Sequence, residues 1–238
     1  MASRRRKRGF FSDWRRLALV VALGGALLAV AIIVLLRLVG PKEPEEVPPN
    51  PIATITMSDG STMRFTLYPD LAPNTVANFI SLANGGFYDR DQARTGKQHF
   101  FRVVAGVFIQ GGDPLNNGTG DPGYAIKGAF AENGFTQNTR SHMRGTISMA
   151  RPSGYDTAGS QFFIMQGSYP EYDGRYAAFG RIDENDAESF ATLDAIGSQP
   201  TDSTYLPLTR QVIASIRVET FDADYGAPEK IDREQGKQ

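Results

Sequence analysis

Short β-type runs dominate residues 52–221 and constrain the fold of this chain more than any other feature. The runs alternate apolar and polar residues or are continuously apolar, and loops rich in Gly, Asn and Asp separate them. They cover residues 52–57, 62–68, 100–104, 107–110, 146–149, 161–165, 177–182 and 211–218. We expect helices at residues 73–84, which begin with a proline, and at residues 187–196, which a glycine follows. Many short strands with only two helices predict a mainly β domain that forms a closed antiparallel barrel.

The first 39 residues differ in charge from the rest of the chain. They hold eight Lys/Arg and one Asp, whereas residues 40–238 hold 17 Lys/Arg and 25 Asp/Glu. The larger part is acidic, so nucleic acid is not an expected partner. Cysteine is absent, which excludes disulfides, thiolate catalysis, cysteine metal ligands and a lipid-modified cysteine. The two histidines, His99 and His142, leave little for a zinc site, so we expect no metal site. We expect no cofactor either.

Residues 17–36 form an uncharged apolar run of membrane-spanning length. A helix of this length rises about 30 Å, which matches the hydrocarbon core of a bilayer. Seven basic residues precede the run and Arg37 follows it, which predicts a cytoplasmic N-terminus and an extracytoplasmic domain. We therefore expect a single-pass cell-membrane anchor at residues 17–39, after a basic cytoplasmic arm at residues 1–16.

A cleaved signal peptide is the alternative interpretation of this segment. Ala29-Val30-Ala31 offers a small-x-small cleavage site. The apolar region of a signal peptide is usually only about 7–15 residues long, so the anchor is the preferred prediction.

Two further segments border the β-rich domain, which we place at residues 52–221. Residues 40–51, GPKEPEEVPPNP, contain five prolines and are predicted to form an extended linker. A ligand for a proline-binding domain is a second interpretation of this stretch. Residues 222–238 are rich in charge, and we expect a flexible tail there.

One arginine, two glutamines and several aromatic residues gather in two of the β-type segments. These segments are FFRVVAGVFIQGGDP, residues 100–114, and SQFFIM, residues 160–165. The chain has no GxSxG motif, Gly159-Ser160-Gln161 does not match one, and neither histidine has an evident triad context. Such a set of residues is suited to gripping a peptide and polarising an amide, so we do not expect a hydrolase.

Six motifs, in order along the chain, resemble those of the cyclophilin-type peptidyl-prolyl cis/trans isomerases. They are TLYPDLAPNTVANFISLANGGFYD (66–89), FFRVVAGVFIQGGDP (100–114), GTGDPGYAIKGAF (118–130), HMRGTISMAR (142–151), AGSQFFIM (158–165) and YDGRYAAFGRI (172–182). The resemblance covers about residues 52–221. It implies an eight-stranded antiparallel barrel capped by two helices. It also implies a monomeric catalytic domain that acts, without a cofactor, on proline-containing segments of unfolded or exported proteins.

The reaction of that family suits these residues. An X–Pro peptide bond rotates over a barrier of about 18–20 kcal/mol, because resonance stiffens the C–N bond. In the twisted amide the nitrogen lone pair is localised, so a positioned hydrogen-bond donor stabilises the transition state without a covalent intermediate. The resemblance implies that this donor is Arg102, and that Gln110 binds the substrate backbone and holds the arginine.

The resemblance also assigns a substrate groove. Its residues are Phe101, Val107, Phe108, Gln110, Ala150, Arg151, Gln161, Phe163, Tyr172 and Tyr176. Val107, Phe108 and Phe163 would form the wall of the proline pocket. Ala150 and Arg151 would bind, through backbone groups, the residue before proline. Alternation along a strand points Phe162 and Phe163 to opposite faces, and the family pattern selects Phe163 for the pocket.

Several positions depart from the family pattern. Phe101 stands where histidine is usual, Val107-Phe108 where Phe-Met is usual, and Arg151 where Asn is common. Glu171 takes the place of a tryptophan at the rim, so we expect weak binding of cyclosporin-type inhibitors.

Two functions remain open at this stage. The first is a membrane-anchored isomerase that assists the folding of exported or membrane proteins, since X–Pro bonds equilibrate slowly in newly translocated chains. The second is a non-catalytic chaperone or scaffold with the same barrel, which the unusual Phe101 and Val107 keep open.

Overall fold

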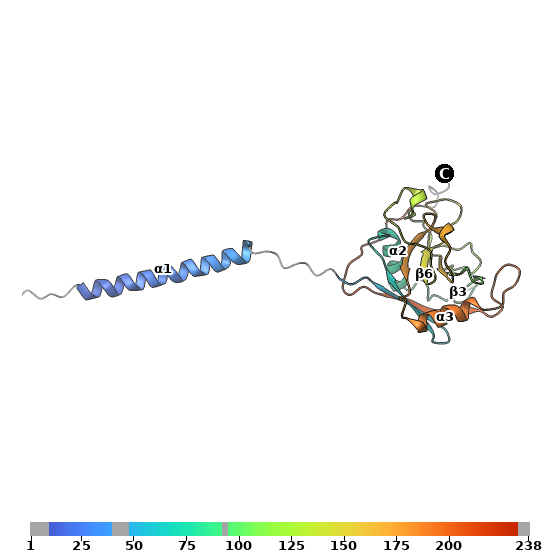
Figure 1. Cartoon of the computed structure of the whole chain (residues 1–238), viewed down its shortest axis with the longest axis horizontal. Coiled ribbons are helices and arrows are strands. Elements are labelled where there is room, and N and C mark those ends of the chain that lie inside the picture. Colours follow the sequence, from blue (N-terminus) through green and yellow to red (C-terminus); the bar gives the residue numbers. More distant parts are fainter. Residues whose placement is uncertain (1–9, 40–47, 92–94, 233–238) are drawn as a thin grey trace, which may run out of the picture. The chain divides into compact units, whose positions relative to one another are not determined.

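The structure of the chain is a computed structural model that describes residues 10–39, 48–91 and 95–232 (Figure 1). The chain divides into two compact units, Met1–Val47 and Pro48–Gln238. The first unit contains helix α1 (Phe10–Val39). Most of the predicted basic arm, at residues 1–9, and most of the predicted linker, at residues 40–47, lie outside the described residues.

Helix α1 contains the apolar segment predicted to span a membrane. Within the described residues, Arg16–Leu35 is the one helical stretch long and apolar enough to cross a bilayer, and none of it is buried. A membrane anchor and a signal sequence can both have this length and composition, so the segment fits either interpretation.

Nine β-segments of the described chain form one antiparallel sheet. They are β1 (Ile52–Met57), β2 (Thr62–Leu67), β3 (His99–Phe100), β4 (Arg102–Val104), β5 (Phe108–Gly111), β6 (Thr146–Met149), β7 (Phe162–Met165), β8 (Ala177–Arg181) and β9 (Gln211–Glu219). Their order across the sheet is β3-β9-β1-β2-β8-β6-β7-β5-β4.

The two ends of this sheet, β3 and β4, are consecutive in the chain and are separated only by Phe101. One bent stretch therefore pairs with β9 through β3 and with β5 through β4, which nearly closes the sheet into a barrel. The predicted mainly β barrel is confirmed. The implied count of eight strands holds when β3 and β4 are taken as one strand that bends at Phe101.

Two α-helices, α2 (Pro73–Asn84) and α3 (Ala187–Gly197), pack on different parts of the barrel (Figure 1). Helix α2 begins at a proline, whose missing N–H is not needed in the first turn. Helix α3 begins after Asp186, whose side chain accepts a hydrogen bond from the Ser189 N–H. The predicted helices at 73–84 and 187–196 agree with these bounds to within one residue.

The barrel core is rich in aromatic side chains. Phe79 of α2 is fully buried, and its ring centroid lies 5.7 Å from that of Phe162 and 5.0 Å from that of Phe179. Phe162 belongs to β7, so the helix packs directly behind the strand that carries Phe163 on its other face. Core packing thus places one strand of the predicted groove.

Residues 222–232 of the predicted flexible tail, which we call the C-terminal strap, make hydrogen bonds to the domain. Ile231 and Ala125 exchange two backbone hydrogen bonds of 2.8 and 3.0 Å. Asn74 on α2 exchanges two more with the backbone of Glu229, and Pro228 is buried. A charged composition does not reveal such hydrogen bonds, so the sequence pattern did not indicate them. Residues 233–238 of the predicted tail lie outside the described residues.

Candidate active site

The antiparallel register brings the predicted site residues into one row across neighbouring strands. Arg102 lies opposite Gln110, Gln110 lies opposite Phe163, and Phe163 lies opposite Ser148. Directly opposed residues point to the same face of a sheet. The arginine, the amide and the aromatic ring are therefore neighbours, although they are far apart in the sequence.

Two glutamines connect the arginine to a loop. The Arg102 guanidinium donates a long hydrogen bond of 3.4 Å to the Gln110 side-chain oxygen. Gln110 donates in turn to Gln161 at 3.0 Å, and Gln161 donates to the carbonyls of Gly118 and Gly120. A guanidinium has five N–H donors, so the bond to Gln110 leaves donors for a ligand.

A cluster of apolar, mostly aromatic side chains lies beside this arginine. It contains Phe108 and Phe163, which the resemblance assigns to the proline pocket, so we call it the aromatic pocket. Its buried members are Phe108, Phe163 and Met165, and its partly buried members are Val104, Val107, Ala150, Tyr169, Tyr172 and Tyr176. The ring centroids of Phe108 and Phe163 are 5.6 Å apart, and Tyr176 meets Phe163 edge-on at 5.4 Å. The guanidinium carbon of Arg102 lies 5.0 Å from the Phe108 centroid. A cation and its hydrogen-bond donors therefore border an apolar cluster.

A cavity of about 350 Å³ opens next to Gln110; we call it the polar pocket. Its lining includes Gln161, Ala150 and Arg151, together with residues 118–121. Among the predicted site residues, Phe101 lies in neither pocket: it is nearly buried, and its ring lies close to Gly118. The structure therefore brings the predicted groove residues together with the exception of Phe101.

The side chain of Arg151 has a structural position that the sequence did not indicate. It donates to the Arg175 carbonyl at 2.9 and 3.2 Å, and to the carbonyls of residues 152–154 at 3.2–3.4 Å. The guanidinium carbon also lies 4.9 Å from the Tyr176 ring centroid. This arginine joins the loop that borders the polar pocket to the loop that carries Tyr176.

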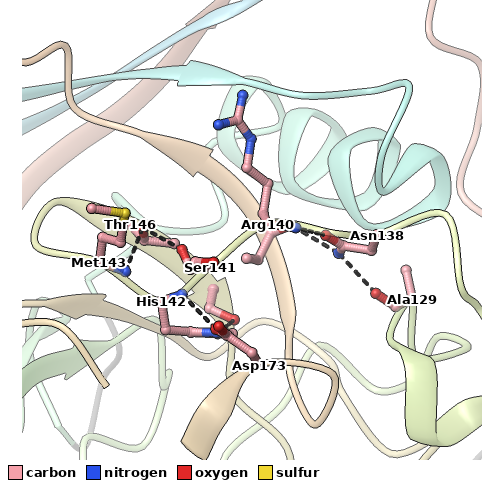
Figure 2. Close-up of polar contacts among 10 residues, drawn as sticks. Ala129, Asn138, Arg140, Ser141, His142, Met143, Thr146 and Asp173 are labelled. Atoms are coloured by element: carbon pink, nitrogen blue, oxygen red, sulfur yellow. Dashed lines mark hydrogen bonds and ion pairs between the residues drawn. The ribbon is translucent and has the colours of Figure 1, made fainter. Parts of the chain in front are cut away.

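His142 lies behind the aromatic pocket and was not among the predicted site residues. Its ring stacks on Phe163 at a centroid distance of 5.9 Å and an interplanar angle of 13°. One ring nitrogen lies 2.8 Å from the Asp173 carboxylate (Figure 2), and the other lies 3.0 Å from the Ser148 hydroxyl. Burial lowers the pKa of His142 below its ordinary value, and Asp173 opposes that shift.

His142 contacts both Ser148 and Asp173, as the histidine of a hydrolase triad contacts its serine and aspartate. The surroundings of these three residues differ from those of a triad. Ser148 is fully buried, so a substrate carbonyl has no access to its hydroxyl. The neutral ring satisfies both partners when it donates to Asp173 and accepts from Ser148. This arrangement supports Phe163 from behind and agrees with the expectation that the chain is not a hydrolase.

Tyr205 is a second residue that the sequence did not single out. It lies between α3 and β9, and its carbonyl accepts a hydrogen bond of 2.8 Å from the Val103 N–H. Its ring centroid is 5.8 Å from the guanidinium carbon of Arg102. No local signal connects these positions, because the contact depends on how the loop before β9 folds against β4.

An antiparallel barrel with a cationic donor, amide groups and an aromatic pocket defines a peptide-binding protein of the isomerase type. The comparisons agree: residues 52–218 match the family described as cyclophilin type peptidyl-prolyl cis-trans isomerase/CLD. The chain belongs to this family, which confirms the predicted enzyme class.

Individual relatives show how far the similarity extends. Peptidyl-prolyl cis-trans isomerase B of Bacillus subtilis is 44% identical over 126 residues, which are 53% of this chain and 79% of that protein. A Helicobacter pylori isomerase is 41% identical over 152 residues, which are 64% and 83% of the two chains. A Cryptosporidium parvum cyclophilin-type isomerase, crystallised in the presence of the dipeptide Ala-Pro, is 28% identical with a TM-score of 0.57. The similarity covers 71% of this chain and 98% of that one.

Proposed function

We propose that Arg102 is the catalytic residue of this isomerase and donates a hydrogen bond to the prolyl nitrogen of the twisted amide. The observation that supports this role best is the position of the guanidinium, 5.0 Å from the Phe108 ring at the edge of the aromatic pocket. A proline ring in that pocket would hold its nitrogen near the arginine. Because the nitrogen accepts a hydrogen bond only when the amide is twisted, the interaction favours the transition state over both planar forms.

The rest of the groove then has distinct tasks. The aromatic pocket, which includes Phe108, Phe163 and Tyr172, binds the proline ring. This binding excludes water from the rotating bond. Gln110, with its amide already ordered by Gln161, binds the substrate backbone. The backbone of Ala150 and Arg151 binds the residue before proline, and residues further toward the N-terminus of the substrate enter the polar pocket of about 350 Å³.

A substitution of Arg102 tests the catalytic role. The full chain is purified in detergent, and cis/trans exchange on a proline peptide is measured by NMR, without a coupled protease. Arg102→Ala is expected to lower kcat/KM by at least about tenfold, because the loss of one transition-state donor costs about 10²–10³ in other enzymes. Arg102→Lys is the matched variant that keeps the charge but loses the planar donor geometry, and it is expected to recover only part of the rate. Equal rates for the wild type and Arg102→Ala would remove Arg102 from the mechanism.

The cellular setting of the isomerase belongs to the same proposal. The apolar segment Arg16–Leu35 anchors the chain in the cell membrane as a single-pass helix. The N-terminus lies in the cytoplasm and the catalytic domain lies on the extracytoplasmic side of the membrane. There the monomeric domain acts on proline-containing segments of exported or membrane proteins. The length of the apolar helix and the basic residues before it support this topology.

Cysteine labelling tests the topology, since the chain contains no cysteine of its own. Glu219 is exposed at the end of β9, so Glu219→Cys offers one reactive thiol on the domain. A membrane-impermeant maleimide is expected to label this variant in intact cells and to label it to the same extent after lysis. Labelling only after lysis would overturn the orientation. Recovery of the labelled chain without its first 30 or so residues would favour a cleaved signal peptide.

A further inference from the structure

Arg102 has a second aromatic neighbour besides Phe108. The guanidinium carbon lies 5.0 Å from the Phe108 centroid and 5.8 Å from the Tyr205 centroid. Phe108 belongs to the pocket itself, whereas Tyr205 comes from the loop between α3 and β9. An arginine side chain has many rotamers. Two rings and the long hydrogen bond to the Gln110 amide together restrict it more than that hydrogen bond alone.

The backbone of Tyr205 has an unusual conformation. Its φ angle is +67°, in the left-handed region that glycine and asparagine adopt readily and bulky residues avoid. The loop holds it there through main-chain bonds: the Tyr205 N–H donates to the Asp202 carbonyl, and the Tyr205 carbonyl accepts from Val103. The Asp202 carboxylate accepts three further bonds, from the N–H and hydroxyl of Thr204 and the N–H of Leu206.

These hydrogen bonds explain the backbone conformation of Tyr205, but they do not explain why its side chain is that of a tyrosine. Any residue except proline can make the two main-chain bonds of Tyr205, and glycine would make them with less strain. The tyrosine side chain is not core packing either, because Tyr205 is 48% exposed. The contact with Arg102 is therefore the feature that distinguishes a tyrosine from a glycine at this position.

We propose that Tyr205 is a positioning residue that keeps the Arg102 guanidinium facing the aromatic pocket. The inference rests on the proposed role of Arg102. The ring attracts the cation from the side of the α3–β9 loop, while Gln110 holds it from β5. Because Tyr205 acts through Arg102, its loss lowers the rate of rotation more than the affinity for the peptide.

Two substitutions separate the ring from the backbone. Tyr205→Gly removes the ring and relieves the left-handed strain, and Tyr205→Phe keeps the ring without the hydroxyl. In the full chain in detergent, exchange on a proline peptide is expected to fall about two- to fivefold in kcat for Tyr205→Gly, with KM unchanged. Tyr205→Phe is expected to stay close to the wild type. The matched control is Leu208→Ala, because Leu208 is 71% exposed in the same loop and its loss is expected to leave kcat unchanged.

Thermal unfolding shows whether the effect is structural. Tyr205→Gly is expected to keep its Tm within about 3 °C of the wild type, since relief of strain offsets the added flexibility of the unfolded chain. Should this variant unfold early, Tyr205→Asn replaces it, because asparagine also tolerates the left-handed region. Wild-type kcat in a folded variant without the ring would refute the positioning role.

A double substitution distinguishes this inference from the proposed function. If Tyr205 acts through Arg102, then Arg102→Ala/Tyr205→Gly has the same kcat as Arg102→Ala alone. Losses that multiply would show that Tyr205 acts independently and would overturn the inference while leaving Arg102 in place. Wild-type kcat in Arg102→Ala would instead refute the proposed function itself.

Discussion

At the scale of a single residue, His142 connects the aromatic pocket to two polar side chains behind it. Its ring stacks on Phe163, and its nitrogens contact Asp173 and Ser148. Burial lowers the pKa of His142, and burial also lowers the pKa of His99. In both cases the folded chain holds the histidine neutral at a pH where the unfolded chain binds a proton.

This difference predicts that the free energy of unfolding falls as the pH falls below about 6.5, the ordinary pKa of histidine. Below that pH the unfolded chain binds more protons than the folded chain, so protonation favours unfolding until the lower folded pKa is reached. Each histidine contributes a slope of up to about 1.4 kcal/mol per pH unit. Urea unfolding at pH 7.5, 6.5 and 5.5 measures the slope.

Single variants assign the slope to each histidine. His142→Gln is expected to be less stable at every pH but to show a smaller slope between pH 6.5 and 5.5. His99→Gln is the comparison, since the pKa of His99 is lowered for the same reason. An unchanged slope in His142→Gln would show that this ring does not stay neutral in the folded chain.

At the scale of an element, helix α2 supports strand β7 through an aromatic side chain that it places in the barrel core. Phe79 is fully buried and contacts Phe162, and Phe162 lies next to Phe163 on β7. The local pattern predicted this helix because proline, apolar spacing and the following glycines are all close in the sequence. The pattern did not show which strand the helix packs against.

Phe79→Ala is expected to lower the free energy of unfolding by about 3–5 kcal/mol, because it leaves a cavity among fully buried rings. Chemical denaturation at pH 7.5 measures the change. Ser81→Ala is the control on the same helix: Ser81 is exposed, and its substitution is expected to stay within about 0.5 kcal/mol. A loss below about 1 kcal/mol for Phe79→Ala would contradict the close packing of α2 on β7.

The C-terminal strap matters at the scale of the whole domain. The strap, residues 222–232, follows the part that matches the family, which ends at residue 218. It joins α2 through Asn74 to the loop that contains Ala125, by four hydrogen bonds in all. The neighbouring Ile126 bonds Ala158, close to Gly159 and Ser160 in the polar pocket.

Removal of residues 222–238 is therefore expected to destabilise the domain by about 2–6 kcal/mol, at about 0.5–1.5 kcal/mol for each hydrogen bond. Removal of residues 233–238 alone is the control and is expected to have no such effect. Differential scanning calorimetry of both truncated chains compares the transitions. Equal Tm values for the two chains would show that the strap does not hold the domain together.

The sequence by itself determined the elements and the family. Alternation, prolines and turn glycines act over a few residues, so strands, helices and motifs can be read from neighbouring positions. It also indicated Arg102, Gln110 and Phe163, through motifs within which each residue has a set place.

Only the tertiary structure decided which side chains meet. Barrel closure brings Tyr205 to Arg102, the pairing of loops brings Asp173 to His142, and backbone bonds hold the strap against Ala125. Each of these contacts joins positions far apart in the chain, and its energy exists only after the barrel has closed. A pattern of neighbouring residues therefore does not predict such a contact.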